Sequence, residues 1–218
     1  MVTEKEVATV FSILEKNHQP TMLELLGHYT HFQMLVMTLL SSRTKDSTTI
    51  PIVKKLFQRY PTPQDFMTAD RTALEKAIYG IGFYRVKAVH LQQLSKILIE
   101  KYHGNVPHDF QSLTSLPGVG RKTANCMLNY AFHLPAIAVD IHVHRIANRL
   151  GWITTATPEE SEKALETVVP KPLWIKVNQL FVGHGQTICM PINPKCEICP
   201  INLYCAYGRN KLSLKSNK

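Results

Sequence analysis

Four cysteines near the C-terminal end constrain the fold of this chain more than any other feature. Four of its five cysteines lie within the last thirty residues in the spacing C-x6-C-x2-C-x5-C, at Cys189, Cys196, Cys199 and Cys205. Secreted disulfide scaffolds spread their cysteines along the chain and follow a signal peptide, whereas Glu4 and Glu6 here precede a short amphipathic pattern. Four thiolates in one short loop can instead enclose a metal ion or a metal cluster, so the pattern predicts a metal centre.

The pairing of the cysteines bears on the kind of metal. A structural zinc site usually has two C-x2-C pairs, and this chain has one such pair and two outlying cysteines. Four reduced cysteines without a metal are the remaining alternative. The fifth cysteine, Cys126, is expected to be a small buried hydrophobe and not a ligand.

Helical periodicity dominates the rest of the chain. The segment 31–42 is long and uniformly apolar, which indicates a buried central helix. Capped or amphipathic patterns predict further helices after Thr3, before Gly80 and over 85–102, 157–168 and 173–187. Because alternating strand patterns and hairpin dipeptides are absent from the sequence, the predicted fold class is all-α.

The charge of the chain favours a polyanionic partner. Its 218 residues carry a formal net charge of +9, which suits nucleic acid or an acidic membrane surface. No stretch approaches the ~18–20 apolar residues of a membrane span. We therefore expect a soluble monomer in the cytoplasm, associated with the nucleoid if the organism is prokaryotic and with no membrane partner.

The stretch LPGVGRKTANCML joins a Pro-Gly-x-Gly turn to two cations and a helical pattern. A P-loop requires lysine directly after its last glycine, and here Arg121 separates Gly120 from Lys122. A helix-hairpin-helix over about 109–131 fits better. Bare backbone at Gly118 and Gly120, and N–H groups at the start of the second helix, can bind a DNA phosphate. The alternative is an ordinary interhelical turn with exposed basic residues.

A carboxylate follows the lysine by eighteen residues. Asp140 comes directly after the apolar run 136–139, so it is expected at the edge of the core. A carboxylate there is a helix N-cap, an acid/base group or both. Lys122 is either a solvated phosphate contact or a nucleophilic amine, whose pKa is lowered by Arg121 and the helix N-terminus.

The motifs LPGVGRKTAN and IAVDIHVHRIANR, followed by the four C-terminal cysteines, resemble the endonuclease III family of helix-hairpin-helix DNA glycosylases. The resemblance covers about residues 23–207. It implies that Lys122 is a Schiff-base nucleophile and that Asp140 is the carboxylate assisting it. It also implies a bifunctional DNA glycosylase and AP lyase, which removes oxidised or ring-saturated pyrimidines and cuts 3′ to the abasic site.

The same resemblance implies a [4Fe-4S] cluster on the four C-terminal cysteines, in place of zinc. It further implies two helical domains. A six-helix domain with the hairpin is expected over 24–134, and a cluster domain joins 1–23 to 135–211. Residues 212–218 are expected to form a flexible tail. Double-stranded DNA with a damaged base or an abasic site is expected to lie across the cleft between the domains.

Further DNA contacts are implied on the loops 41–46 and 80–88. Arg43 stands where bacterial relatives commonly carry glutamine, and Phe83 follows a Gly-Ile-Gly turn that can present an apolar wedge. A phenylalanine of the core is the alternative for Phe83, and a histidine that only orients its loop is the alternative for His142. The remaining expected DNA contacts are Gly118, Gly120, Arg121, His142, Arg145 and Lys195.

Three other functions stay open at this point. A mismatch uracil or thymine glycosylase would share the fold. A DNA-binding regulator that uses the cluster as a sensor would need neither Lys122 nor Asp140. A metal-dependent nuclease would need clustered acidic ligands, and the sixteen acidic residues of the sequence show no such cluster.

Overall fold

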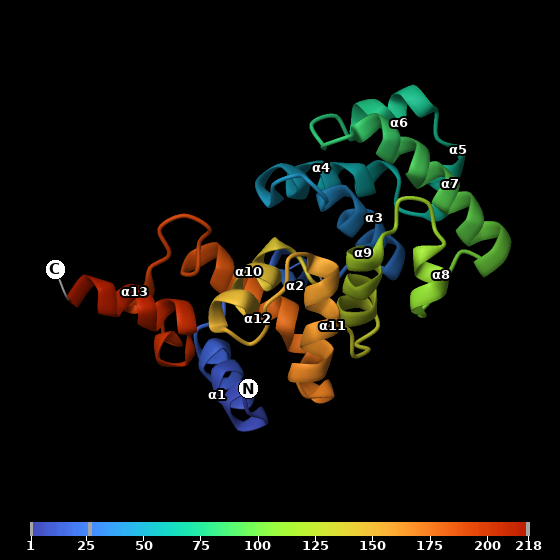
Figure 1. The fold of residues 1–218 in the computed structure, drawn as a ribbon. Helices are drawn as coiled ribbons and strands as arrows, with labels where there is room; N and C mark the ends of the chain where they lie inside the picture. The colour runs from blue at the N-terminus through green and yellow to red at the C-terminus, as the bar shows by residue number, and fades with distance from the viewer. Residues whose placement is uncertain (1, 26–27, 217–218) are drawn as a thin grey trace. The chain divides into compact units, whose positions relative to one another are not determined.

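The computed structural model describes residues 2–25 and 28–216, and these contain helices and no strand (Figure 1). The predicted all-α class is confirmed. The chain divides into two compact units. The hairpin unit is Met22–His133, and the cluster unit joins Met1–Thr21 to Leu134–Lys218. The division expected from the sequence was 24–134 against the remainder.

The described part of the hairpin unit has eight α-helices and one π-helical turn. They are α2 (Met22–Leu25), α3 (His31–Ser41), α4 (Asp46–Arg59), α5 (Pro63–Thr68), α6 (Arg71–Ala77), α7 (Tyr84–Tyr102), α8 (Phe110–Thr114) and α9 (Arg121–Cys126), followed by η1 (Met127–Ala131). The sequence predicted about six helices. One extra helix arises because Asp70 accepts a hydrogen bond from Ala73 N and so starts α6 separately from α5, and the other is the single turn of α2.

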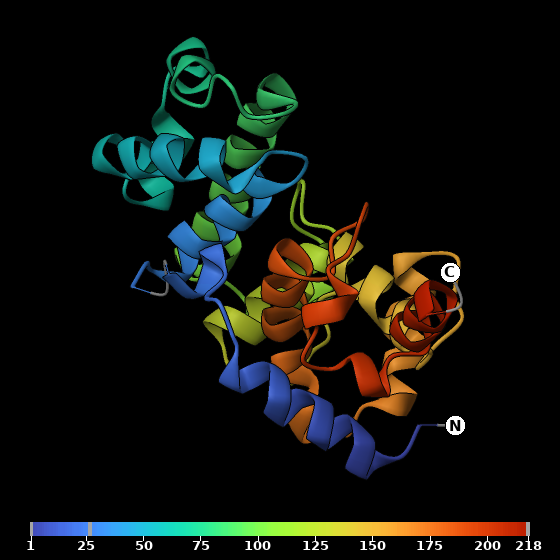
Figure 2. The same ribbon diagram turned by 90° about the vertical axis from the view of Figure 1, so that its left-hand side faces the viewer.

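The central helix of the hairpin unit is α3, as the apolar run 31–42 predicted. Thr30 and Gln33 form a reciprocal capping box at its start, and the side chains from Met34 to Leu40 are buried. This helix packs against α4, α7 and α9 (Figure 2). Its C-terminal end therefore has a fixed position within the unit, and the loop that carries Arg43 begins there.

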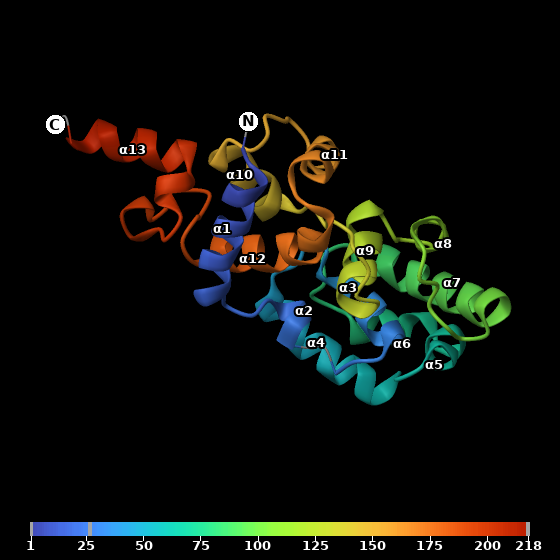
Figure 3. The same cartoon turned by 90° about the horizontal axis from the view of Figure 1, so that it is seen from below.

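The cluster unit is built from five α-helices and three short 3-10 turns among its described residues. They are α1 (Glu4–Lys16), α10 (Ile141–Leu150), α11 (Pro158–Val168), α12 (Trp174–Thr187) and α13 (Ala206–Ser216), with turns at Lys171–Leu173, Cys196–Ile198 and Asn202–Tyr204. Both α1 and α10 pack against α12 (Figure 3). Phe11, Trp152 and Phe181 meet in the core with ring centroids 5.7–5.9 Å apart.

The last helix of the chain covers part of the segment 212–218, for which a flexible tail stays a prediction. The helix α13 continues to Ser216, consistent with the good helix-forming residues leucine and lysine in this segment. Residues 217–218 lie outside the described residues. In the part of the chain that the structure describes, no helix is long and apolar enough to cross a membrane.

Candidate active site and metal centre

The predicted helix-hairpin-helix is present in the hairpin unit. Asp109 accepts a hydrogen bond from Ser112 N and starts α8, and the chain turns through residues 115–120 into α9. Leu116 and Val119 are buried and hold the turn to the core. The two glycines that flank Val119 are exposed. The turn therefore presents backbone to the solvent while its apolar residues anchor it.

The structure requires glycine at only one of the two hairpin positions. Gly118 has φ +79°, and a Cβ on it would lie 2.8 Å from His90 Nδ1, so a side chain there would strain the backbone and clash. A Cβ on Gly120 would meet open space. Gly120 is the N-cap residue of α9 and supplies no side-chain cap. The bare backbone at the start of α9 is thus the surface on which the sequence predicted a phosphate contact.

Two cations open α9 directly after this backbone. Arg121 is exposed, and its guanidinium carbon lies 4.8 Å from the centroid of the Phe110 ring on α8. Lys122 is half-buried in the same turn, and every residue from Thr123 to Ala131 is buried. The helix continues into the π-helical turn η1, which the sequence did not predict. Lys122 therefore stands on an element held by the core of the hairpin unit.

Asp140 lies in the cluster unit as the N-cap residue of α10. Its Oδ1 accepts hydrogen bonds from His142 N at 2.8 Å and Val143 N at 2.9 Å. The preceding segment 136–139 is buried, which places Asp140 at the edge of the core as expected. Both capping bonds use one carboxylate oxygen. The second oxygen takes no part in the cap, so the N-cap role leaves half of the carboxylate for chemistry.

The guanidinium of Arg145, on α10, is engaged inside the cluster unit. It donates to Cys189 O at 2.9 and 3.1 Å and to Gly185 O at 3.1 Å, and it lies 3.0 Å from His142 Nδ1. Burial is the main cause that lowers the pKa of this guanidinium. The His142 ring thus lies within hydrogen-bond distance of the Arg145 guanidinium. The DNA contacts predicted for both residues remain predictions.

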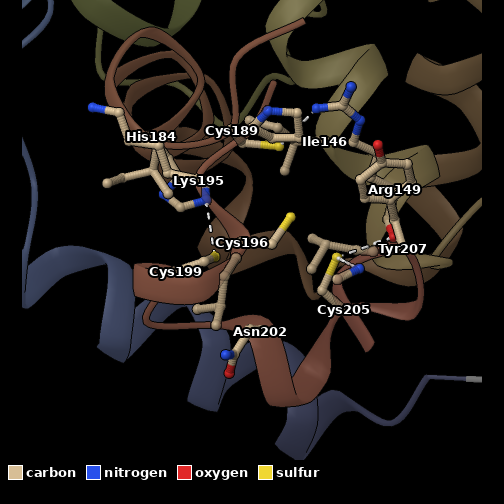
Figure 4. Close-up of a pocket in the computed structure, with 15 residues that line it drawn as sticks. Ile146, Arg149, His184, Cys189, Lys195, Cys196, Cys199, Asn202, Cys205 and Tyr207 are labelled. Carbon is tan, nitrogen blue, oxygen red and sulfur yellow. Dashed lines mark hydrogen bonds between the residues drawn. The ribbon is translucent and has the colours of Figure 1, made fainter. Parts of the chain in front are cut away.

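The four C-terminal cysteines surround one pocket of the cluster unit (Figure 4). None of them is in a disulfide. Among the described residues, however, no group of three His, Cys, Asp or Glu side chains could hold a single metal ion. The four cysteines nevertheless line one cavity. The donor set is thiolate, which suits iron–sulfur chemistry.

Hydrogen-bond donors also reach the sulfur atoms of this pocket. Arg149 Nη1 donates to Cys189 Sγ at 3.3 Å, and Gly208 N donates to Cys205 Sγ at 3.3 Å. His184 Nε2 lies 3.7 Å from Cys199 Sγ. Such donors stabilise negative charge on cluster-bound sulfur and tune its potential.

Burial shapes the titration of two groups in the pocket. It raises the pKa of the Cys199 thiol to about 11, so this thiol is protonated at neutral pH until a metal displaces the proton. Burial, with Arg145 nearby, lowers the pKa of His184 to about 4, so the ring is neutral beside the sulfur. The sequence analysis missed Arg149 and His184. Arg149 follows Arg145 by one helical turn, and that spacing was the available signal.

Arg43 and Phe83 lie together in the hairpin unit. The guanidinium carbon of Arg43 is 5.7 Å from the centroid of the Phe83 ring. Phe83 is 64% exposed, so the alternative of a core phenylalanine is wrong. Lys195 is exposed on the loop between Cys189 and Cys196.

Comparisons with known proteins agree with this arrangement. Residues 36–171 match the model of the HhH-GPD superfamily of base excision DNA repair proteins. Residues 189–205 match the iron-sulfur binding domain of endonuclease III. The chain is 48% identical over 180 residues to endonuclease III of Thermotoga maritima, and the match covers 83% of this chain and 84% of that protein.

Solved structures give the same result. The chain matches a structure of a trapped endonuclease III–DNA covalent intermediate with a TM-score of 0.87 and 35% identity, over 97% of this chain and 100% of that one. It also matches a thermostable thymine-DNA glycosylase with a TM-score of 0.80 and 26% identity, over 94% of this chain and 95% of that one. The chain therefore belongs to the endonuclease III family of HhH-GPD base excision DNA repair proteins, the DNA glycosylases with AP lyase activity that carry a [4Fe-4S] cluster.

Proposed function

We propose that this protein excises oxidised or ring-saturated pyrimidines from double-stranded DNA through the amine of Lys122, and then cuts the strand 3′ to the abasic site. The observation that carries the proposal is the place of Lys122 in the first turn of α9. That turn follows directly on the exposed backbone of Gly118 and Gly120. A phosphate bound to this backbone brings the neighbouring sugar close to the amine.

The chemistry balances with one amine and one carboxylate. The Lys122 amine attacks C1′ of the flipped nucleotide, and the base leaves with the electron pair of the glycosidic bond and takes up a proton. Loss of the amine proton and opening of the sugar ring give an iminium at C1′. The iminium acidifies the C2′ hydrogen, and removal of that proton breaks the C3′–O bond. The strand is thereby cut on the 3′ side.

Asp140 has two parts in this scheme. Through Oδ1 it holds the first turn of α10. The second carboxylate oxygen stabilises the cationic sugar as the base departs, or takes the proton from the amine. The trapped covalent endonuclease III–DNA intermediate supports the amine route, since it was obtained with a relative of this chain.

Four cysteines hold the cluster in this proposal: Cys189, Cys196, Cys199 and Cys205. When bound, the cluster supplies a rigid centre for the loop 189–205 and takes no part in the bond changes. Lys195 on that loop, with Arg121 and the hairpin backbone, contacts phosphate. We propose that the protein acts on its DNA substrate as a monomer.

The choice of lesion rests on family membership, and one observation supports a second candidate. The likeness to a thermostable thymine-DNA glycosylase favours excision of mismatched thymine or uracil as the alternative substrate class. The two classes differ in the damaged base and share the chemistry at C1′.

The test is borohydride trapping on a duplex with one abasic site, followed by a panel of duplexes with thymine glycol, dihydrouracil or a G·T or G·U mismatch. We expect a covalent adduct with the abasic duplex and base release from the first two lesions. Release from the mismatches alone would replace the proposed substrate class by the alternative. No adduct would contradict the amine mechanism, and cutting that EDTA abolishes would indicate a metal-dependent nuclease.

The variant Asp140→Asn separates the capping role of this side chain from its proposed chemical role. Asparagine is as good an N-cap as aspartate, so we expect the free energy of unfolding to change by less than about 1 kcal/mol. Loss of the charge is expected to lower the rate of base release by roughly 10²- to 10⁴-fold. Single-turnover kinetics on a thymine glycol duplex, with thermal melts beside them, measure both. Base release at the wild-type rate would show that Asp140 is only a cap.

A further inference from the structure

Two loops of the hairpin unit hold strained backbone at neighbouring positions. Residues 42–45 connect α3 to α4, and residues 79–83 precede α7; we name them the paired loops. Arg43 has φ +55° and Phe83 has φ +58°, and both are non-glycine residues in the left-handed region. Strained backbone of this kind persists only where the surroundings over-determine it, and it is concentrated at functional sites.

The paired loops are fastened directly to each other. Gly82 N donates to Thr44 Oγ1 at 3.0 Å. A Cβ on Gly82 would lie only 2.8 Å from Arg43 O, so no side chain fits between the two backbones. The Arg43 guanidinium lies over the exposed Phe83 ring. The two strained residues therefore reach the solvent side by side, as one surface.

A buried lysine in the first turn of α7 connects this helix to the end of α3 and to the loop that carries Arg43. Lys87 is 6% exposed, and its Nζ donates to Leu40 O at 3.0 Å and to Ser42 O at 2.6 Å. These carbonyls belong to the last turn of α3 and to the first residue of the loop that carries Arg43. Burial lowers the pKa of Lys87 to about 8 because its charge is poorly solvated.

The cost of this burial points to a role beyond stability. Well-packed apolar side chains often stabilise a protein as well as a buried charge does. Lys87 donates its hydrogen bonds to the end of α3 and to the loop that follows. These bonds fix the direction in which the backbone leaves the helix. A cation at a helix C-terminus also interacts favourably with the helix dipole.

We propose that Lys87 is a positioning residue for extrusion of the damaged or abasic nucleotide from the duplex, and that it holds the paired loops in the strained conformation that presents Arg43 and Phe83 together. The proposal rests on the proposed function, because it assumes that the protein opens duplex DNA before amine attack. The preformed pair of side chains enters the base stack at the lesion without the loss of conformational entropy that ordering two separate loops would require. Lys87 acts through the loops and does not touch the reacting atoms.

The test compares two substrates that share one chemical step. Lys87→Met keeps the length of the side chain and removes the donors. Cutting at an abasic site is measured in a duplex and in the same strand without its complement, which needs no opening. We expect kcat/KM on the duplex to fall by about tenfold or more, since small misplacements of binding groups cost this much. On the single strand we expect the variant to equal the wild type.

Three further variants make the result specific. Lys87→Arg, which can donate to the same two carbonyls, is expected to restore most of the duplex activity. Thr44→Val removes the bond to Gly82 N from the other side and, on a partly exposed loop, keeps the test valid if Lys87→Met does not fold. We expect it to lower duplex activity selectively as well. Ser95→Ala, on the buried face of the same helix, is the control and is expected to leave both substrates unchanged.

Two results would overturn the proposal. Equal losses on both substrates would mean that Lys87 only supports the fold, and unchanged duplex activity would mean that the loops hold their shape without it. Failure of the wild type to cut either substrate is a different result, because it contradicts the proposed function itself.

Discussion

Replacement of Lys122 by glutamine is expected to abolish the borohydride-trapped adduct and strand cutting at an abasic site. Glutamine has similar length and helix propensity, so α9 and its contacts with the core are retained. Its amide nitrogen is not nucleophilic, and no imine can form. We expect the cutting rate to fall by at least about three orders of magnitude, the scale on which enzymes lose activity with their nucleophile. Single-turnover cutting assays and denaturing gels of the trapped complex measure the loss.

Binding should separate from chemistry in the same variant. Most of the affinity comes from phosphate contacts, so we expect the dissociation constant of the Lys122→Gln protein to stay within about tenfold of wild type at matched salt. Arg121→Gln is the matched control, because it removes the neighbouring cation from the same helical turn. It should weaken DNA binding and still give the trapped adduct. An adduct that survives in Lys122→Gln would assign the nucleophile to another amine.

The elements that could be predicted from the sequence are those whose signal is local. The buried helix α3 followed from a single apolar run, and α11 followed from the cap Thr157-Pro158 with Glu160, which forms a capping box in the structure. The hairpin followed from the spacing of its glycines. The pocket lined by four cysteines followed from their clustering. In each case neighbouring residues carry the full physical reason for the structure.

The elements that were missed depend on contacts distant in sequence or on local exceptions. The helix α4 contains Pro51, which removes a backbone donor and normally argues against a helix interior. The π-helical turn after α9 has no distinctive sequence signal. Lys87 donates to carbonyls 45 and 47 residues away in sequence. The residues next to it in the sequence therefore give no sign that it is buried.

The same distinction applies to Arg145, which the sequence placed among the DNA contacts. Its position at the end of the stretch IAVDIHVHR indicated only its charge and its place five residues after Asp140. The structure shows that its donors reach Cys189 O, 44 residues further along the chain. An arginine near this motif can therefore bond the backbone of the cluster loop, and its contact with phosphate stays a prediction.

Replacement of Cys199 by alanine is expected to have the second large effect. It removes one of the four thiolates that line the pocket, and alanine offers no ligand in its place. Metal-site binding energy is also folding energy, so loss of the cluster should cost several kcal/mol of stability. A loss of about 5 kcal/mol lowers the Tm of a protein of this size by about 10–20 °C. We expect colourless, poorly soluble protein.

Cys126→Ala is the matched control for the cysteine variant, because it also removes one thiol and Cys126 lies buried on α9 outside the pocket. This control should keep its visible absorbance and iron content, with a modest loss of stability of about 1–2 kcal/mol from the small volume removed. Iron analysis, absorbance spectra and thermal melts of both variants give the comparison. A coloured, stable Cys199→Ala protein would contradict its assignment as a ligand. Loss of iron from Cys126→Ala would move the ligand set to α9, and the pocket in Figure 4 would then need another explanation.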